Sequence, residues 1–209
     1  MRTFLWFHMI IWAFPVFSTT DTAYSEHPKQ GIVDLLLEWM EAYYDTSYHR
    51  GDLLYVSVHR QSMFHVRNGK LLKEYPISTA QNGLGSEKNS FRTPTGLHRI
   101  SEKFGDGVPA FGVLKDRRFS GQVADTLAAG HQDRDQITSR VLWLEGLEPG
   151  HNRGGQRDSH ERFIYIHGTS NEAAIGRPVS RGCIRMRNKD VIELYDQVPV
   201  GTRLVVLDN

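Results

Sequence analysis

The chain has 209 residues, 39% of them hydrophobic and 23% charged, and a formal net charge of +1 at pH 7. This length allows one domain with an appendage, and the composition is that of an ordinary globular protein. With a charge so close to zero, and no long block of lysine or arginine, we expect no nucleic-acid partner. The chain holds a single cysteine and therefore cannot form an intramolecular disulfide.

The first 25 residues have the pattern of a secretory signal peptide. Arg2 supplies the positive start, and residues 4–17 are almost entirely apolar. Ala23 and Ser25 place small residues at the two positions that a signal peptidase reads. An uncleaved membrane anchor is the alternative, but the apolar run is short for a spanning helix. We expect cleavage after Ser25 and a soluble mature protein in the periplasm or cell envelope.

Residues 26–51 are expected to form an N-terminal helical segment. Apolar side chains recur there at helical spacing, and acidic residues lie largely on the opposite face. The apolar positions are Ile32, Leu35, Leu36, Trp39, Met40 and Tyr43. We expect this amphipathic helix to pack on the domain that follows; a partner-binding helix is the alternative. An acidic polar face argues against binding to an anionic membrane.

From Asp52 onward the pattern changes to short strands separated by turn signals, so residues 52–209 are expected to form one mainly β domain of the sandwich or barrel type with few helices. Asn68-Gly69 is a strong signal for a tight hairpin turn between two of the strands. The expected strands are residues 53–58, 63–66, 71–77, 97–100, 141–144, 163–166 and 202–207.

Two stretches of this domain contain little to bury. Residues 115–139 are rich in arginine, aspartate and glycine, and we expect a long surface excursion of the kind that often forms a lid or binding loop. A glycine-rich loop covers residues 149–155. Nearer the C terminus, apolar residues at helical spacing from Val191 to Val198 predict a helix, with Asn188 as its N-cap.

The single cysteine, Cys183, is the strongest functional signal. A free thiol is mostly protonated at neutral pH and needs a base or a positive setting to react. His167 ends an expected strand and could supply the base. No acidic residue falls between Arg177 and Lys189, a stretch that favours the thiolate and attracts carboxylate-bearing substrates. Its other arginines are Arg181, Arg185 and Arg187.

Backbone features around the thiol support the same interpretation. Gly182 carries no side chain, so a substrate can approach the backbone beside Cys183, and the amides of this turn are candidates for binding an oxyanion. Taken singly, a lone cysteine is most often a small buried hydrophobe, but one reaction centre explains all of these features together. The ten histidines are scattered and form no His-Glu-x-x-His motif. We therefore expect no metal and no cofactor.

At these residues the chain resembles a known family. Residues 166–169 (IHGT), followed by 175–186 (IGRPVSRGCIRM), are similar to the signature of YkuD-type L,D-transpeptidases. Residues 93–96 (TPTG) resemble a turn of that family, and the resemblance covers the chain from about Asp52 to the C terminus. Many members have histidine where this chain has Arg181, which leaves the main base unaffected.

The resemblance implies an enzyme that remodels bacterial peptidoglycan. Its cysteine attacks the carbonyl between the L-centre of diaminopimelate and the terminal D-alanine of a tetrapeptide stem, which releases D-alanine and leaves a thioester. A second diaminopimelate amine would then give a 3→3 cross-link, a lysine of an envelope protein would give a protein–wall tether, and water would make the enzyme an L,D-carboxypeptidase. Carbapenem-type inhibitors are expected to acylate Cys183.

The resemblance also implies a role for each site residue. Cys183 is the nucleophile and His167 the general base, while Gly168 and Ser180 shape and orient the pair. Backbone amides around Gly182 and Cys183 hold the oxyanion. Arg185 and Arg181 are the expected substrate-binding residues. Two alternatives stay open: a non-catalytic wall-binding module, against which the presence of both Cys183 and His167 argues, and a secreted cysteine endopeptidase.

Overall fold

The computed structural model describes residues 29–44, 50–125 and 136–209, so the expected signal peptide lies outside the described residues. The described chain contains two α-helices, α1 (Gln30–Tyr43) and α2 (Asn188–Gln197), and no helix in it is long and apolar enough to cross a membrane. Its strands are β1 (Asp52–Ser57), β2 (Ser62–Arg67), β3 (Lys70–Ser78), β4 (Gly96–Phe104), β5 (Gly112–Lys115), β6 (Arg118–Val123), β7 (Ile137–Gly146), β8 (Tyr165–Thr169), β9 (Ile184–Met186) and β10 (Arg203–Leu207).

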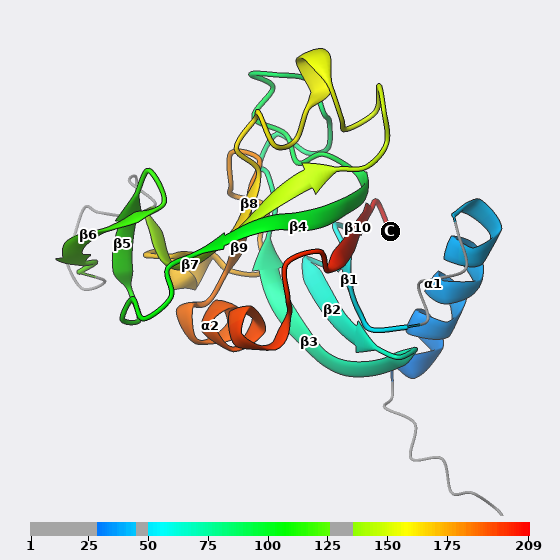
Figure 1. Ribbon diagram of the computed structural model, residues 1–209, viewed down its shortest axis with the longest axis horizontal. Helices are drawn as coiled ribbons and strands as arrows, with labels where there is room; N and C mark the ends of the chain where they lie inside the picture. Colours follow the sequence, from blue (N-terminus) through cyan, green and yellow to red (C-terminus); the bar gives the residue numbers. More distant parts are fainter. Residues whose placement is uncertain (1–28, 45–49, 126–135) are drawn as a thin grey trace, which may run out of the picture.

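The strands form one sheet that closes on itself, in agreement with the expected mainly β, barrel-like fold (Figure 1). Their order is β4-β10-β1-β2-β3-β9-β8-β7, and a further pairing of β4 with β7 completes the ring. Closure leaves these eight strands without an open edge. The β5–β6 hairpin extends outward from β7. Two pairings are parallel, β1 with β10 and β8 with β9.

The core lies inside this ring and follows from the alternation of side chains along the strands. Inward-facing residues of the eight strands of the ring and of α2 form one buried cluster. On the strands its members include Leu54, Ile77, Ile100, Leu142, Ile166, Ile184 and Leu204, and α2 adds Val191 and Leu194. Apolar burial of this extent is the main favourable term in folding. The helix expected from Val191 to Val198 is therefore part of the core.

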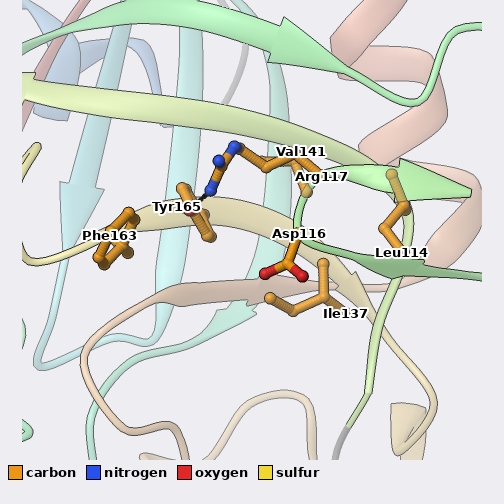
Figure 2. Close-up of a pocket in the computed structure, with 7 residues that line it drawn as sticks. All are labelled: Leu114, Asp116, Arg117, Ile137, Val141, Phe163 and Tyr165. Carbon is orange, nitrogen blue, oxygen red and sulfur yellow. Dashed lines mark hydrogen bonds between the residues drawn. The ribbon is translucent and has the colours of Figure 1, made fainter.

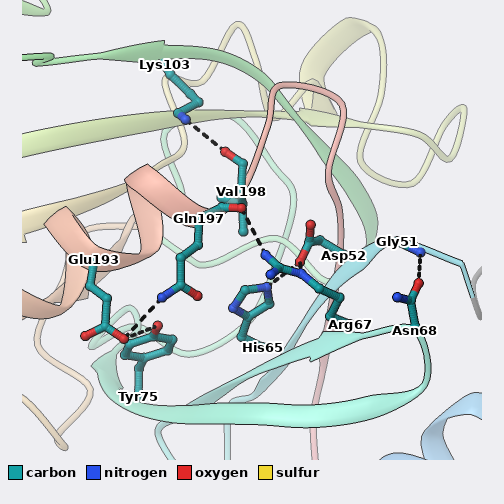
Figure 3. A network of polar contacts seen from close by, with 10 residues as sticks. All are labelled: Gly51, Asp52, His65, Arg67, Asn68, Tyr75, Lys103, Glu193, Gln197 and Val198. Carbon is teal, nitrogen blue, oxygen red and sulfur yellow. Dashed lines mark hydrogen bonds and ion pairs between the residues drawn. The ribbon is translucent and has the colours of Figure 1, made fainter.

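Side chains of the barrel bind the carbonyl groups at the C-terminal end of α2, which have no partner within the helix (Figure 3). The Lys103 ammonium donates to the carbonyl oxygens of Tyr195 and Val198 at 2.6 and 2.8 Å. Arg67 donates to the Gln197 carbonyl at 3.2 Å. Cations are also favourable at this negative end of the helix dipole. These contacts fix the position of α2 on the barrel.

The N-terminal helix packs on the outside of the barrel, as expected, and four positions of the expected stripe face inward: Leu36 and Met40 are buried, and Ile32 and Trp39 pack beside them. Val33 and Leu37 are buried with residues of β1 and β2, whereas Leu35 and Tyr43 are 69% and 71% exposed. The prediction that Leu35 and Tyr43 face the domain was therefore wrong. The Gln30 side chain explains the rotation, because its amide donates to the Gly69 carbonyl and accepts the Leu71 N–H.

The hairpin turn expected at Asn68-Gly69 is confirmed, with φ angles of 51° and 76°. The long surface excursion expected over residues 115–139 is not a loop throughout, and residues 126–135 of it lie outside the described residues. It contains β6, which pairs with β5 through a turn at Asp116 and Arg117, whose φ angles of 47° and 64° are those of a tight hairpin. Because β6 is mostly exposed, its sequence carries no buried alternation that could have revealed the strand.

A buried histidine links β4 to the loop before β8. The His98 Nδ1 lies 3.0 Å from the Gly96 carbonyl oxygen, and the Nε2 lies 3.0 Å from Ser159 Oγ. A carbonyl can only accept, so Nδ1 donates and Nε2 accepts from the hydroxyl, which describes a neutral ring. Burial lowers the pKa of His98 to about 4. This ring is therefore stable in the fold only without a proton.

We expect His98 to make the fold sensitive to acid. Between pH 6.5 and 4 His98 is protonated in the unfolded chain but stays neutral in the folded protein. Protonation therefore favours the unfolded state, and stability is lost as the pH falls. The loss attributable to this residue is about 3 kcal/mol at pH 4. Urea unfolding at pH 7, 5 and 4 measures it, with His98→Asn as the comparison. Equal losses in the wild type and the variant would contradict the assignment.

Candidate active site

Cys183 lies on the turn that leads into β9, with its side chain half-buried. It packs against the cluster of Val141, Trp143 and Tyr165 on the outer face of β7 and β8, opposite the barrel core. Its Sγ lies 3.4 Å from the carbonyl oxygen of Phe163, the residue two positions before β8. The thiol is therefore held at the surface of the barrel, beside the start of β8.

The parallel pairing of β8 with β9 brings His167 to the same face as Cys183. Ile166 pairs with Ile184, and both point into the core. His167 follows Ile166, and Cys183 precedes Ile184. Because side chains alternate along an extended chain, His167 and Cys183 both point to the opposite face. His167 was expected at the end of its strand; it lies in the middle of β8 and is only 3% exposed.

A backbone contact determines the tautomer of His167. Its Nδ1 lies 2.7 Å from the carbonyl oxygen of Gly168. Because that oxygen can only accept, Nδ1 carries the proton, and in the neutral ring the lone pair lies on Nε2. Such a ring can take a proton at Nε2 while its orientation is held through Nδ1. This is the arrangement that a general base requires.

Ser180 and Gly182 shape the turn that carries Cys183. The Ser180 hydroxyl donates to the Cys183 carbonyl at 2.5 Å and accepts the Gly182 N–H at 3.2 Å. Gly182 has a φ of 123°, and a Cβ there would lie 3.2 Å from Ile164 and 3.3 Å from the Arg92 carbonyl oxygen. The turn therefore needs glycine for its backbone conformation and for its space. The Gly182 N–H, expected to help bind an oxyanion, is engaged within the turn.

A second loop supports this turn from the outside. The Thr93 hydroxyl donates to the Gly182 carbonyl at 3.0 Å and accepts the Ala80 N–H at 2.9 Å. Asn152, in the glycine-rich loop, is fully buried and donates to the carbonyl oxygens of Thr95 and Leu97. The loops at residues 93–96 and 149–155 thus form one hydrogen-bonded support beneath the Cys183 turn.

Asn188 connects the site to α2, although not as the expected N-cap. The helix begins at Asn188 with Arg187 in the cap position, and a carboxylate oxygen of Glu172 accepts the Asn188 N–H at 2.6 Å. The Asn188 side chain instead accepts both hydroxyls of Thr138 and Ser139 at 2.6 Å. It also donates to the Thr169 carbonyl at 2.8 Å. Its buried position, next to the end of β8, explains why the cap prediction was wrong.

Gly168 is required by the same packing. A Cβ at Gly168 would lie 2.6 Å from the Thr138 carbonyl oxygen and 2.8 Å from the side-chain oxygen of Asn188. Real Cβ atoms do not approach backbone oxygens so closely, so a larger residue would push β8 away from β7. Since the Gly168 carbonyl binds His167 Nδ1, any such shift would also move the histidine ring.

Asn188→Ala is expected to lower the free energy of unfolding by about 2–4 kcal/mol, because it leaves two hydroxyls and one carbonyl buried without this partner. Urea unfolding measures the change. Lys189→Ala is the matched control, since it alters the next, exposed residue of the same helix and should change stability by less than about 0.5 kcal/mol. Equal effects of the two substitutions would contradict the role given to Asn188.

The two expected substrate-binding arginines lie in different settings. Arg185 is 9% exposed on β9 and pairs in register with His167. Arg181 is exposed, and its guanidinium lies 4.6 Å from the centre of the Phe91 ring. Arg177, also expected to add to a positive field, is exposed as well. Of these three arginines, only Arg185 is buried between the strands of the site.

Sequence reasoning missed Arg162, which lies at the other side of the thiol. Burial lowers the pKa of its guanidinium, and the negative charges of Cys183 and Glu87 oppose that shift. Electrostatic coupling to Cys183 places the two groups near one another. No motif in the sequence singles out this residue, because the loop before β8 folds back onto the turn of Cys183 only in three dimensions.

A cavity of about 300 Å³ opens on the face of the sheet that carries Cys183 (Figure 2). Its walls come from the β5–β6 hairpin and from β7 and β8, and they include two members of the cluster against which Cys183 packs. The lining residues are Leu114, Asp116, Arg117, Ile137, Val141, Phe163 and Tyr165. The hairpin that the sequence did not predict therefore forms one wall of the cavity next to the cluster on which Cys183 packs.

Asp116, Arg117 and Tyr165 form the polar part of this cavity. The Arg117 guanidinium donates to the Tyr165 hydroxyl at 3.2 Å and lies 4.7 Å from the Trp143 ring. Burial raises the pKa of Tyr165, the cation of Arg117 opposes the shift, and the negative charges of Cys183 and Asp116 add to it. Tyr165 is thus a neutral hydroxyl held by Arg117 close to the thiol.

No group of three histidine, cysteine, aspartate or glutamate side chains suited to a metal ion occurs within residues 29–44, 50–125 and 136–209.

Comparison with known proteins identifies similar sequences and structures. Residues 51–206 match the L,D-transpeptidase catalytic domain family. Bacillus subtilis YkuD, which carries the name of an L,D-transpeptidase, is 66% identical over 41 residues, or 20% of this chain and 25% of that protein. Bacillus subtilis YqjB, similarly named, is 38% identical over 72 residues, or 32% of this chain and 41% of that protein. The matched segments therefore span less than half of these relatives.

Solved structures of similar proteins are more distant. An L,D-transpeptidase from Mycobacterium smegmatis is 19% identical with a TM-score of 0.44, over 75% of this chain and 58% of that one. L,D-transpeptidase 3 from Mycobacterium tuberculosis, in complex with a faropenem-derived adduct, is 14% identical with a TM-score of 0.47, over 76% and 60% of the two chains.

Proposed function

The chain belongs to the L,D-transpeptidase catalytic domain family, and from this premise we propose that it is an exported enzyme that acts on peptidoglycan tetrapeptide stems through a thioester at Cys183. One observation carries the proposal: Cys183, on the turn into β9, and His167, on the parallel neighbour β8, lie on the same face of the sheet, and His167 is oriented by the Gly168 carbonyl. Export rests on the sequence pattern of residues 1–25, and N-terminal analysis of the secreted protein tests it.

Acylation is the first half of the proposed reaction. His167 Nε2 takes the proton of the Cys183 thiol, and Sγ bonds to the carbonyl carbon between the L-centre of diaminopimelate and D-alanine. The carbonyl oxygen becomes an oxyanion, for which the backbone of the Cys183 turn supplies the candidate donors. The C–N bond then breaks, and the protonated His167 returns its proton to the nitrogen of D-alanine. A thioester at Cys183 and free D-alanine result.

Transfer is the second half. His167 takes a proton from the acceptor amine as its nitrogen bonds to the thioester carbon, the C–S bond breaks, and Cys183 leaves as a thiolate. A diaminopimelate amine gives a 3→3 cross-link, a lysine of an envelope protein gives a tether to the wall, and water gives L,D-carboxypeptidase activity. A carbapenem is expected to acylate the same sulfur, because its strained carbonyl replaces the stem as the acyl donor.

The cavity beside Cys183 is the proposed site for the donor stem. It combines the apolar side chains of Leu114, Ile137 and Val141 with the Arg117 cation and the Tyr165 hydroxyl. A pocket of this kind holds the aliphatic part of a ligand and orients it with a few polar groups. Arg117 is suited to the carboxylates of a stem, since guanidinium groups bind carboxylates through two hydrogen bonds.

Product analysis tests the proposal. The purified protein is incubated with disaccharide-tetrapeptide, alone and with a lysine-containing acceptor peptide, and the products are read by mass spectrometry. Protein whose thiol has been blocked with iodoacetamide is the control. Loss of one D-alanine only with the open thiol supports acyl transfer; a dimer then indicates cross-linking, and a tripeptide indicates hydrolysis. An unchanged stem would favour the wall-binding module, and cleavage of an ordinary protein substrate would favour an endopeptidase.

A further inference from the structure

Arg162 binds the loop that faces the turn of the nucleophile. Its Nη2 donates to the Arg92 carbonyl at 2.7 Å and to the Ser90 hydroxyl at 3.4 Å, and its Nη1 donates to the Gly85 carbonyl at 3.3 Å. One guanidinium thus holds three points of residues 85–92. This use of several donors in a fixed planar group is particular to arginine.

The Arg92 carbonyl joins this contact to the nucleophile. Its oxygen would lie 3.3 Å from a Cβ on Gly182, the residue directly before Cys183. On the other side of the thiol, Sγ lies 3.4 Å from the carbonyl of Phe163, the residue directly after Arg162. Arg162 therefore directly precedes Phe163, whose carbonyl contacts the thiol. It also binds the Arg92 carbonyl, which lies against Gly182 in the turn of Cys183.

The charge of Arg162 is also only partly screened. The side chain is half-buried, and its partners in the loop are two neutral carbonyls and a hydroxyl. Glu87, the nearby acid, is paired with Arg157 on the surface. Hydrogen bonds to neutral groups do not cancel the charge of Arg162, so its guanidinium can still attract a neighbouring anion such as the Cys183 thiolate. Salt screens this half-buried charge less than it screens an exposed one.

We propose that Arg162 is a positioning residue for Cys183: it holds the Arg92 carbonyl against Gly182 and stabilises the cysteine thiolate by its charge. The inference rests on the proposed role of Cys183 as the nucleophile. It assigns the positive setting of the thiol to the loop before β8, rather than to the exposed Arg177 and Arg181 of the cysteine segment. A thiolate that is populated at neutral pH reacts without waiting for proton removal.

Other titratable groups surround the thiol and must be held constant in the test. They are Tyr165 and His167 on β8, Arg185 on β9, Arg181 on the turn, Glu87 on the facing loop, and Asp116 and Arg117 on the hairpin. The test therefore changes Arg162 alone. Arg157 is the matched control, because it lies in the same segment between β7 and β8. Arg157→Gln also removes one positive charge, but from an exposed side chain that pairs with Glu87.

The experiment is the rate of alkylation of Cys183 by iodoacetamide as a function of pH, in the wild type, Arg162→Gln, Arg162→Lys and Arg157→Gln. The midpoint of the rise reports the pKa of the thiol. We expect Arg162→Gln to raise it by about one pH unit, Arg162→Lys to restore most of the shift, and Arg157→Gln, which only leaves Glu87 unpaired, to change it by much less than Arg162→Gln does. Thermal unfolding checks that each variant is folded.

An unchanged midpoint in folded Arg162→Gln would overturn the proposal and leave Arg162 a structural residue only. If Arg162→Gln does not fold, Arg162→Lys decides: it keeps the charge, so a midpoint within half a unit of the wild type is expected, and a full unit of change would overturn the electrostatic claim. Alkylation needs no substrate. A shifted midpoint in a protein that releases no D-alanine would therefore reject the proposed reaction while supporting this inference.

Discussion

Cys183→Ala is expected to release no detectable D-alanine from a tetrapeptide stem and to form no carbapenem adduct. The proposed reaction passes through a bond to Sγ, and no other cysteine in the chain can replace it. The measurement is D-alanine release by mass spectrometry, over incubation times long enough to detect very slow turnover. The effect should be chemical, because the half-buried Cys183 side chain contributes little to the core.

Stability measurements separate chemistry from folding in this variant. Cys183 is only partly buried where it packs against the cluster formed by Val141, Trp143 and Tyr165, so we expect its replacement by alanine to lower the free energy of unfolding by about 1 kcal/mol. Residual D-alanine release from a folded Cys183→Ala protein, above the background without protein, would contradict covalent catalysis at this residue.

His167→Asn is expected to lower kcat/KM for D-alanine release by about 10²–10⁴-fold, the usual contribution of a general base. The asparagine amide can still donate to the Gly168 carbonyl, as Nδ1 does now, but it cannot take a proton. The fall should be accompanied by loss of the steep pH dependence near neutrality. Steady-state kinetics between pH 5 and 9 measure both.

His59→Gln is the control for this substitution, because His59 is an exposed histidine in the turn between β1 and β2. Its kcat/KM should equal that of the wild type. If the two histidine variants retain the same activity, or if His167→Asn raises KM and leaves kcat unchanged, then His167 is not the base and its contact with Gly168 is merely structural.

The strands and their turns were largely predictable from the sequence. Asn68-Gly69 allows few alternatives, because both residues adopt the positive φ angles that a tight hairpin turn requires. The exposed β6 was not predictable, since its burial pattern has no buried residue and therefore no alternation that marks a strand. The rotation of α1 was also hidden, because it depends on Gln30, a polar residue just before the apolar stripe.

The site was predictable where it is local in sequence and not where it is assembled by the fold. Cys183 and His167 stood out through their neighbours, and the parallel register that places them on one face agrees with that expectation. Asn188 looked like a cap because caps and buried hydrogen-bonding residues share the same amino-acid types. Arg162 gave no signal, since its partners at residues 85–92 are distant in the sequence and are mainly backbone carbonyls.

The thioester at Cys183 is the central claim, and direct detection tests it best. The protein is mixed with tetrapeptide stem, quenched in acid, digested and analysed by mass spectrometry. The account predicts that the peptide containing Cys183 gains the mass of the stem without D-alanine, and that an added amine acceptor removes this mass. D-Alanine release that continues after Cys183 has been fully alkylated, with no adduct on its peptide, would contradict the account.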